Sequence, residues 1–307
     1  MKVSIIGGGG RVGSNAAYAL QLGGLARDIA IVDVAEELAR GEALDLRHGA
    51  SVAGAQKIYA GGYDAVAGSD IVVITAGLRR KPDESRLELI NRNVILFKGI
   101  LEAFKKVKLA ANGIMLVVSN PVDILTYMAV KSAVLPPSKV MGLGTVLDTI
   151  RFRSLLAEHF EVDPTGVNAL ILGEHGDSMV PVWSSANVNG VPLRSFPDCD
   201  DEKVKGIFEV TKKSGAEVIR LKGGAGYAVG LAIKAVVDAI ILDKKAVLPV
   251  SSLMQGYMGI ADVCFSVPTV VGRGGVEKLI DIALSEDEKA AMLYSANVLK
   301  ETLKQVQ

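Results

Sequence analysis

Continuous apolar runs and amphipathic stretches alternate along the first half of the chain. The runs carry apolar residues at successive positions, which is typical of strands buried on both faces of a parallel sheet. They lie at residues 3–6, 29–32, 71–75, 113–119 and 140–143. The stretches between them repeat apolar positions at helical spacing, at residues 12–22, 36–47 and 84–107. This order predicts an α/β fold, a Rossmann doubly wound parallel sheet whose ligands bind at the carboxyl ends of its strands.

The pattern changes after about residue 145, where strands and helices no longer alternate regularly. Helical spacing occupies residues 149–160, 204–220, 228–242 and 286–304. Strand signals occupy residues 168–172, 183–188, 247–254 and 267–271, and Asn189-Gly190 marks a hairpin turn. We therefore expect a dinucleotide-binding domain over residues 1–144 and a mixed α+β substrate domain over residues 145–307.

Composition narrows the class of protein. The chain has 307 residues, half of them hydrophobic, and 34 basic residues balance 34 acidic ones. Such a chain lacks the global basic field that favours nucleic acid or an anionic membrane, so any anion site must be local. It shows no signal peptide, no membrane-spanning run and no metal-ligand spacing, and two cysteines are too few for a disulfide framework. We expect a cytoplasmic protein without a bound metal.

A glycine run follows the first predicted strand and precedes the first predicted helix. It reads Gly7-Gly8-Gly9-Gly10-Arg11-Val12-Gly13, and Asp33 ends the second strand 20 residues after Gly13. Backbone amides at such a helix N-terminus can hold a pyrophosphate, and a carboxylate at Asp33 can accept the ribose 2′-hydroxyl and repel a 2′-phosphate. The pattern predicts an NAD site, against the alternative of a glycine-rich turn followed by a solvated aspartate. The glycines fit two dinucleotide-binding patterns, Gly-x-x-Gly-x-x-Gly starting at Gly7 and Gly-x-Gly-x-x-Gly starting at Gly8.

A candidate proton-transfer group lies in the second half. His175, one of three histidines, sits between glycines just after a predicted strand. Asp148 and Arg151 lie three residues apart on one predicted helix face. Asp148 would orient and charge-stabilise His175, and Arg151 would bind a substrate carboxylate with both arms of its guanidinium. The alternatives are a surface-turn histidine and an ordinary helix salt bridge.

The loop after the third predicted strand is rich in basic residues. Arg79, Arg80, Lys81 and Arg86 fall within ten residues on the ligand edge of the predicted sheet. Such a loop is usually solvated, but at this place it can close over an anion as a lid spanning residues 78–91.

Six motifs in order make the chain resemble the lactate/malate dehydrogenase family of NAD-dependent 2-hydroxy-acid dehydrogenases over essentially its whole length. These motifs are Gly7–Gly13 with Asp33, Thr75-Ala76-Gly77, Glu84-Ser85-Arg86, Val118-Ser119-Asn120-Pro121-Val122-Asp123, Asp148-x-x-Arg151, and Gly173-Glu174-His175-Gly176-Asp177-Ser178.

The resemblance implies a role for each matching position. His175 corresponds to the proton donor and acceptor, Asp148 to its carboxylate partner, and Arg151 to the arginine that binds the C1 carboxylate. Arg86 corresponds to the loop arginine that polarises the carbonyl, and Asn120, before a proline that is usually cis, to the asparagine that contacts substrate. The implied NAD contacts are Gly7, Gly8, Gly10, Arg11, Val12, Gly13, Asp33, Thr75, Ala76, Gly77, Asn93, Val118 and Asn120.

Arg80 is the residue from which we predict the substrate. Lactate enzymes of the family carry glutamine there, whereas an arginine would pair with the second carboxylate of oxaloacetate or malate. Ala225 matches a position where lactate enzymes often carry threonine, which leaves room for a longer substrate. We therefore expect an NAD-dependent malate dehydrogenase acting on a dicarboxylate. The alternatives are a lactate or other 2-hydroxy-acid dehydrogenase and a non-catalytic dinucleotide sensor. By analogy we expect a homo-oligomer, a tetramer rather than a dimer.

Overall fold

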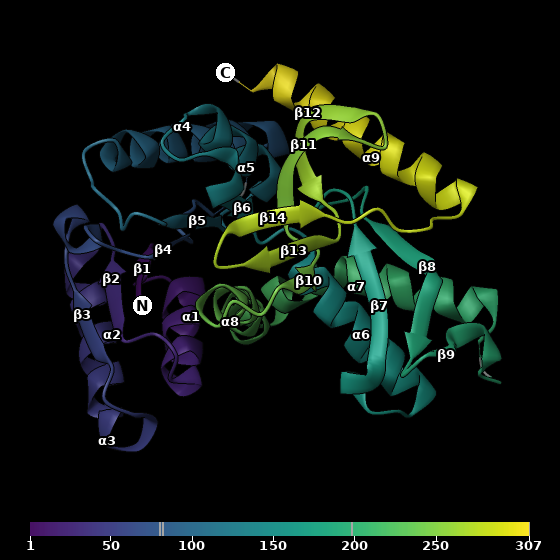
Figure 1. Cartoon of the computed structure of the whole chain (residues 1–307), viewed down its shortest axis with the longest axis horizontal. Helices are drawn as coiled ribbons and strands as arrows, with labels where there is room; N and C mark the ends of the chain where they lie inside the picture. The colour runs from purple at the N-terminus through teal and green to yellow at the C-terminus, as the bar shows by residue number, and fades with distance from the viewer. Residues whose placement is uncertain (80, 82, 198, 307) are drawn as a thin grey trace.

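The computed structural model describes residues 1–79, 81, 83–197 and 199–306. An eight-stranded sheet, in the order β12-β11-β6-β5-β4-β1-β2-β3, runs through its centre (Figure 1). Six strands of the first half pair in parallel, and all residues of β4 and β5 are buried, as their continuous apolar runs predict. These strands are β1 (Lys2–Ile6), β2 (Asp28–Val32), β3 (Lys57–Ala60), β4 (Ile71–Ile74), β5 (Ile114–Val117) and β6 (Val140–Gly142). The predicted doubly wound parallel sheet is confirmed.

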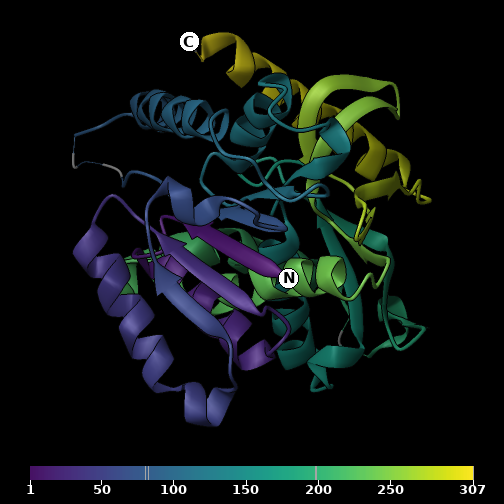
Figure 2. The same cartoon turned by 60° about the vertical axis from the view of Figure 1, so that its left-hand side comes forward.

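Helices cover both faces of this sheet. One face packs against α1 (Arg11–Gly23), α2 (Glu36–His48) and α8 (Tyr227–Ile241). The other packs against α4 (Arg86–Phe104) and α5 (Val122–Lys131). Figure 2 shows β1, β2 and β3 side by side, with α2 lying outside them. A short α3 (Ala50–Ala53) leads into β3, and 3₁₀ turns occupy Tyr63–Val66, Pro137–Lys139, Pro164–Gly166 and Leu193–Ser195.

The second half contributes to the central sheet and also builds sheets of its own. Strands β11 (Ser251–Tyr257) and β12 (Ile260–Ser266) extend the central sheet antiparallel beyond β6. One small sheet contains β7 (Val167–Leu172), β8 (Val180–Val188) and β9 (Val191–Pro192); another contains β10 (Ala246–Leu248), β13 (Thr269–Gly272) and β14 (Gly275–Leu279). Besides α8, the second half contains the helices α6 (Val146–Phe160), α7 (Asp201–Lys222) and α9 (Glu286–Gln305). Strands β11 and β12 and helix α8 thus pack with elements of the first half of the chain. The predicted domain boundary between residues 144 and 145 stays a prediction.

Several predicted elements differ from the observed ones. The predicted strand at 247–254 is two strands, because Pro249 interrupts it, and β3, β12, β14 and α5 lacked a clear signal. The predicted helix at 149–160 begins earlier, at Val146, which places Asp148 inside its first turn. The predicted helix at 84–107 begins at Arg86, because Ser85 and Glu88 form a reciprocal capping box.

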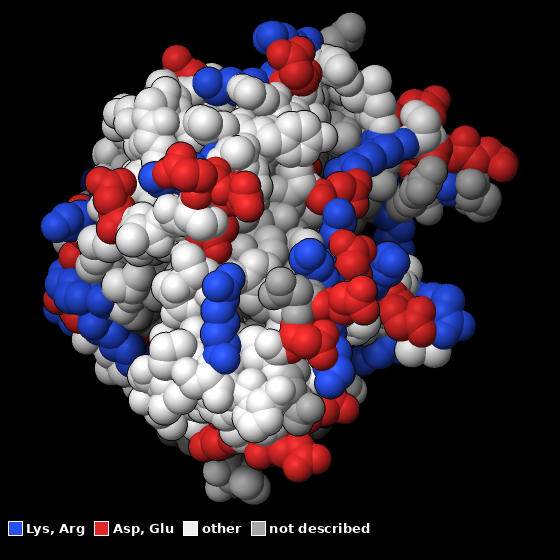
Figure 3. Space-filling model, turned by 90° about the vertical axis from the view of Figure 1, so that its right-hand side faces the viewer, with Lys and Arg blue, Asp and Glu red and all other residues white. Residues whose placement is uncertain are grey.

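Charge is mixed on the face shown in Figure 3. Acidic and basic side chains are interspersed there, so no single-sign field covers it. Within the described ranges, no helix combines the length and apolar composition needed to cross a bilayer.

Candidate active site

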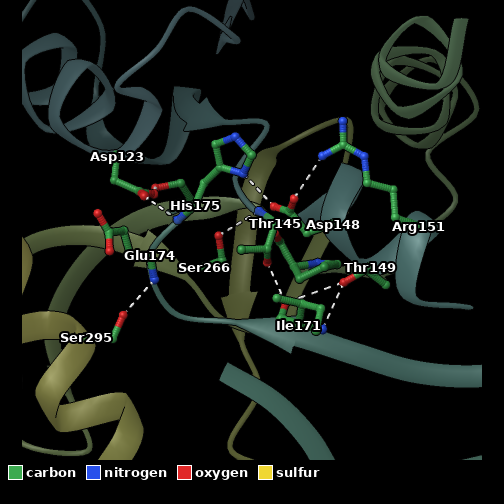
Figure 4. Close-up of polar contacts among 12 residues, drawn as sticks. Asp123, Thr145, Asp148, Thr149, Arg151, Ile171, Glu174, His175, Ser266 and Ser295 are labelled. Carbon is green, nitrogen blue, oxygen red and sulfur yellow. Dashed lines mark hydrogen bonds and ion pairs between the residues drawn. The ribbon is translucent and has the colours of Figure 1, made fainter. Parts of the chain in front are cut away.

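Strand β7 delivers His175 to the centre of the molecule. The strand ends at Leu172, and Gly173 forms two backbone hydrogen bonds of 2.9 Å with Ser266 at the end of β12. Gly173 has a φ of 82°, and a Cβ there would lie 2.7 Å from Ser295 Oγ on α9. Only glycine fits this turn. The N–H of Glu174 then donates to the same Ser295 oxygen at 2.8 Å, so the loop entering His175 is held from two sides (Figure 4).

The first turn of α6 is locked to the same strand. Thr145 donates its hydroxyl to the carbonyl of Ile171 at 2.5 Å, and its N–H donates to Ser266 Oγ at 2.9 Å. Thr149 accepts the N–H of Ile171 at 3.0 Å. These bonds fix Asp148, in the first turn of α6, against the end of β7.

Asp148 and His175 meet as the sequence predicts. The Nδ1 atom of His175 lies 2.5 Å from Asp148 Oδ2. The aspartate side chain is 2% exposed and the imidazole 22%. Burial lowers the pKa of His175, but the charge and hydrogen bond of Asp148, with the charge of Asp123, outweigh it and raise the pKa to about 9. Burial would likewise raise the pKa of Asp148, yet the charges and hydrogen bonds of His175 and Arg151 hold it below its usual range.

Arg151 shares the same carboxylate. Its Nη1 lies 3.3 Å from Asp148 Oδ1, and the side chain is 15% exposed. Asp148 therefore stands between an imidazole and a guanidinium, and Figure 4 shows the two cations on either side of it. A Cβ at Gly215 of α7 would lie 3.5 Å from the Arg151 Nη1, so this guanidinium passes close beneath α7. Arg151 can bind a carboxylate of a ligand, and the neighbouring imidazole of His175 can donate a proton to that ligand or accept one from it.

A second carboxylate, for which no role was predicted, lies beneath the loop that carries His175. Asp123 accepts the backbone N–H of His175 at 2.8 Å and the hydroxyl of Ser251 at 2.6 Å. Its only sequence signal is its place three residues after Asn120.

Arg86 lies on the His175 side of the site, at the first position of α4. Its side chain is 64% exposed, with Nη1 2.5 Å from Asp177 Oδ2 and Nη2 3.7 Å from Glu174 Oε1. Both acids flank His175 in sequence. The predicted contact of Arg86 with a substrate carbonyl stays a prediction, and it requires the arginine to exchange these partners.

Most of the predicted lid, residues 78–91, is described. Residues 78–85 precede α4, and the rest belongs to that helix. Asn93, a predicted NAD contact, uses its amide oxygen to accept the N–H of Leu78 at 2.7 Å and so ties the loop to α4. Arg80 lies outside the described residues, and its described neighbours Arg79 and Lys81 are exposed.

The glycine loop is shaped by packing. A Cβ would lie 2.5 Å from Ala76 N at Gly7, 2.6 Å from Ile31 Cγ2 at Gly8 and 2.4 Å from Gly7 O at Gly13. Contacts below 3.0 Å exclude a side chain at all three positions, whereas Gly10, the N-cap of α1, has its nearest neighbour at 3.3 Å. Both predicted spacings therefore contain sterically required glycines.

The start of α1 offers amides to a phosphate group. Ser14 N donates to Gly10 O at 2.9 Å, so the N–H groups of Arg11, Val12 and Gly13 lie in the first turn, where a helix supplies no acceptor. This cradle fits a pyrophosphate. The guanidinium of Arg11 instead donates to the carbonyls of Lys222 and, at 3.1 Å, Gly224.

Asp33 lies just after β2, as predicted. Its carboxylate accepts the N–H of Gly9 and that of Ala35, each at 3.0 Å. A carboxylate has about four acceptor sites, so it can also accept a ribose hydroxyl. These observations fit NAD, although the individual contacts stay predictions.

The remaining predicted NAD contacts gather at the carboxyl ends of β4 and β5. Thr75 donates its hydroxyl to the carbonyls of Ile6 and Gly7 at 3.0 and 3.1 Å, and Gly77 follows Ala76 beside the glycine loop. Val118 N donates to Ile74 O at 2.8 Å. Asn120 is exposed and its peptide bond to Pro121 is cis, as expected. Among the described residues, no cluster of acidic, histidine or cysteine side chains is placed to hold a metal ion.

Comparisons with known proteins agree along the whole chain. Residues 1–142 match the family model "lactate/malate dehydrogenase, NAD binding domain", and residues 145–307 match "lactate/malate dehydrogenase, alpha/beta C-terminal domain". L-lactate dehydrogenase 1 of Clostridium acetobutylicum is 47% identical, over 98% of this chain and 97% of that protein. The L-lactate dehydrogenase of Acetivibrio thermocellus is 44% identical, over 99% and 96%. NAD is the cofactor that these matches support.

Solved structures give the same result. The minor L-lactate dehydrogenase from Enterococcus mundtii superimposes with a TM-score of 0.94 at 36% identity, covering all of this chain and 98% of that one. A lactate dehydrogenase from a Medee basin deep-sea metagenome gives 0.93 at 35% identity, covering 99% and 98%.

The predicted malate dehydrogenase activity is therefore wrong, and so is its assignment to a dicarboxylate. Relatives at 41–47% identity over nearly the whole chain carry the name L-lactate dehydrogenase. The prediction rested on one residue, Arg80, as the partner of a buried second carboxylate of the substrate. A single charged residue in such a loop is weaker evidence than similarity along the entire chain.

Proposed function

Because this chain belongs to the lactate/malate dehydrogenase family, we propose that it is an NAD-dependent L-lactate dehydrogenase that interconverts L-lactate and pyruvate. The observation that carries the proposal is the placement of His175 and Arg151 around the buried Asp148, in a chain up to 47% identical to L-lactate dehydrogenases. A 2-oxo acid has a carbonyl next to a carboxylate. The site has an imidazole next to a guanidinium, held by one shared aspartate.

His175 moves the proton. Its Nδ1 is committed to Asp148, so Nε2 is the atom that donates to the carbonyl oxygen in reduction and accepts the hydroxyl proton in oxidation. With a pKa of about 9, the imidazole is protonated at pH 7 and ready to donate. Asp148 stabilises the imidazolium and fixes its tautomer. NAD held at the glycine loop and Asp33 would supply the hydride chemistry at C2 of the substrate.

Two arginines act on the substrate: one binds its carboxylate and the other polarises its carbonyl. Arg151 holds the C1 carboxylate, because its planar guanidinium can donate two parallel hydrogen bonds. When Arg86 leaves its ion pair with Asp177, its guanidinium approaches the C2 oxygen. There it stabilises the negative charge that develops on this oxygen during reduction. Asn120 contacts the same substrate from the cis turn after β5.

We also propose that the enzyme works in the cytoplasm as a homo-oligomer. Two cysteines in 307 residues suit a reducing compartment. By analogy with the family, we propose a tetramer rather than a dimer. Sedimentation velocity at micromolar concentration tests this oligomeric state.

Steady-state NADH oxidation with pyruvate and with oxaloacetate, at equal enzyme concentration and pH 7, tests the proposed activity. We expect a larger kcat/KM for pyruvate. A larger kcat/KM for oxaloacetate would overturn the proposed substrate, and no turnover of either would overturn the proposed chemistry. Asp28→Asn, a change at the amino-terminal end of β2, away from the strand ends that carry the site, serves as a matched control.

A further inference from the structure

A buried carboxylate, Asp123, joins three segments that are distant in the sequence. It is the second residue of α5 and follows the cis Asn120–Pro121 bond. Its Oδ2 accepts the His175 backbone N–H at 2.8 Å, and its Oδ1 accepts the Ser251 hydroxyl at 2.6 Å. The turn that carries Asn120, the loop that carries His175 and strand β11 therefore meet at one side chain.

Two carboxylates hold different parts of the same histidine. Asp148 contacts the ring at Nδ1, whereas Asp123 contacts the backbone, and Figure 4 shows them reaching His175 from different directions. A ring hydrogen-bonded only at Nδ1 still moves when the backbone that carries it shifts. The second anchor, at the backbone N–H, restrains that shift and so helps to fix where Nε2 lies. A displacement of about 1 Å at a reacting group can cost about 10²-fold in rate.

We propose that Asp123 is a positioning residue, which fixes the backbone of His175 relative to the turn carrying Asn120, so that both side chains face one substrate. The proposal rests on the proposed function, because it assumes that His175 transfers the proton. Asp123 is buried and directs its two oxygens to protein groups, so it acts through His175.

The electrostatic surroundings favour a functional role. Burial raises the pKa of Asp123 to about 6, although the Ser251 and His175 hydrogen bonds and the charge of His175 act against it. Glu174 on the loop and Cys264 on β12 also face Asp123, and Asp148 and Arg151 lie beyond the imidazole. At pH 7 Asp123 is therefore ionised and adds a negative charge beside His175. A buried charge is costly in free energy, and a neutral residue would avoid that cost.

Two substitutions at this position separate its hydrogen bond from its charge. Asp123→Asn keeps an oxygen that can accept the His175 N–H, so kcat with pyruvate should stay within about threefold of wild type. Asp123→Ala removes the acceptor, so kcat should fall by about tenfold to 10²-fold, while the Kd for NADH, measured by fluorescence, stays unchanged. Ser252→Ala is the matched control, because Ser252 is buried on the same strand as Ser251 and its hydroxyl has no partner among the described residues.

The pKa of His175, measured by NMR titration of the free enzyme, gives a readout that needs no substrate. The chain has three histidines, and the spectrum of His175→Asn identifies the signal. The pKa should fall in Asp123→Asn, because the neighbouring negative charge is gone, and stay unchanged in Ser252→Ala.

Each contrary result overturns a defined claim. An Asp123→Ala enzyme with wild-type kcat, or an Asp123→Asn enzyme as slow as Asp123→Ala, contradicts the backbone anchor. An unchanged His175 pKa in Asp123→Asn contradicts the electrostatic part. If wild type fails to turn over pyruvate while the His175 pKa shifts as expected, the proposed substrate fails and the electrostatic coupling stands. If Asp123→Ala does not fold, Asp123→Asn still decides, through kcat and the His175 pKa.

Discussion

Replacing Asp148 by asparagine removes the charge that holds His175 in its protonated form. The His175 pKa of about 9 lies about 2.5 above its ordinary value of 6.5, although burial acts in the opposite direction. At about 1.4 kcal/mol per pH unit, this difference corresponds to about 3 kcal/mol. The amide also can present its NH₂ group to Nδ1, which favours the wrong tautomer.

We expect Asp148→Asn to lower kcat for lactate oxidation at about pH 10, where His175 starts unprotonated, by about 10²–10³-fold, because the imidazolium formed in that direction loses about 3 kcal/mol of stabilisation. The assay is NADH formation at saturating lactate and NAD, with NADH affinity as the control for folding. Asp28→Asn should behave as wild type. A kcat within threefold of wild type, or a His175 pKa still near 9 in Asp148→Asn, would refute the assigned role.

Three further outcomes follow from the same geometry. Asp33 should make kcat/KM for NADPH at least about tenfold lower than for NADH, because a 2′-phosphate would meet its carboxylate; equal values would contradict this contact. Arg151→Lys should raise KM for pyruvate while leaving NADH affinity unchanged, since an ammonium cannot donate in the same bidentate geometry, and an unchanged KM would contradict carboxylate binding there. Pyruvate reduction by wild type needs protonated His175, so its rate should fall as pH rises through about 9 and lactate oxidation should rise over the same range; identical pH profiles in both directions would contradict the proton assignment.

The sheet was predictable because its strands are buried on both faces. The runs at β4 and β5 are apolar at every position, and such a run has few alternatives beyond a central strand. Strand β3 was missed because it lies at the sheet edge, with Lys57 exposed and only Ile58 fully buried, so its pattern is weak. Helix α5 was missed because it is buried nearly all round and shows no polar face to reveal helical spacing.

The grouping of the central candidate-site residues was predictable because each has a chemical reason visible in a short motif. His175, Asp148 and Arg151 meet as their spacing and residue types indicated. The residues that support them were not predictable from the sequence alone. Asp123 and Ser251 are 128 positions apart, and nothing local shows that they share a hydrogen bond. Asp177 likewise is identified as the partner of Arg86 only in three dimensions.

The substrate prediction failed for a different reason. It required Arg80 and a second substrate carboxylate to form a desolvated pair, and desolvation is a tertiary property that a loop sequence does not contain. The small Ala225 was offered as support, yet a small residue permits a longer substrate without requiring one. Neither residue carried enough weight to decide between two branches of one family.

Single-turnover reduction of pyruvate by enzyme loaded with NADH tests the central claim, that His175 transfers the proton, most directly. The loss of NADH absorbance is followed after rapid mixing for wild type, for His175→Asn and for His159→Asn as the matched control on α6. We predict that His175→Asn binds NADH normally but is slower in the reductive step by about 10²–10⁴-fold, while His159→Asn matches wild type. A His175→Asn enzyme that oxidises NADH within a few-fold of the wild-type rate would contradict the account.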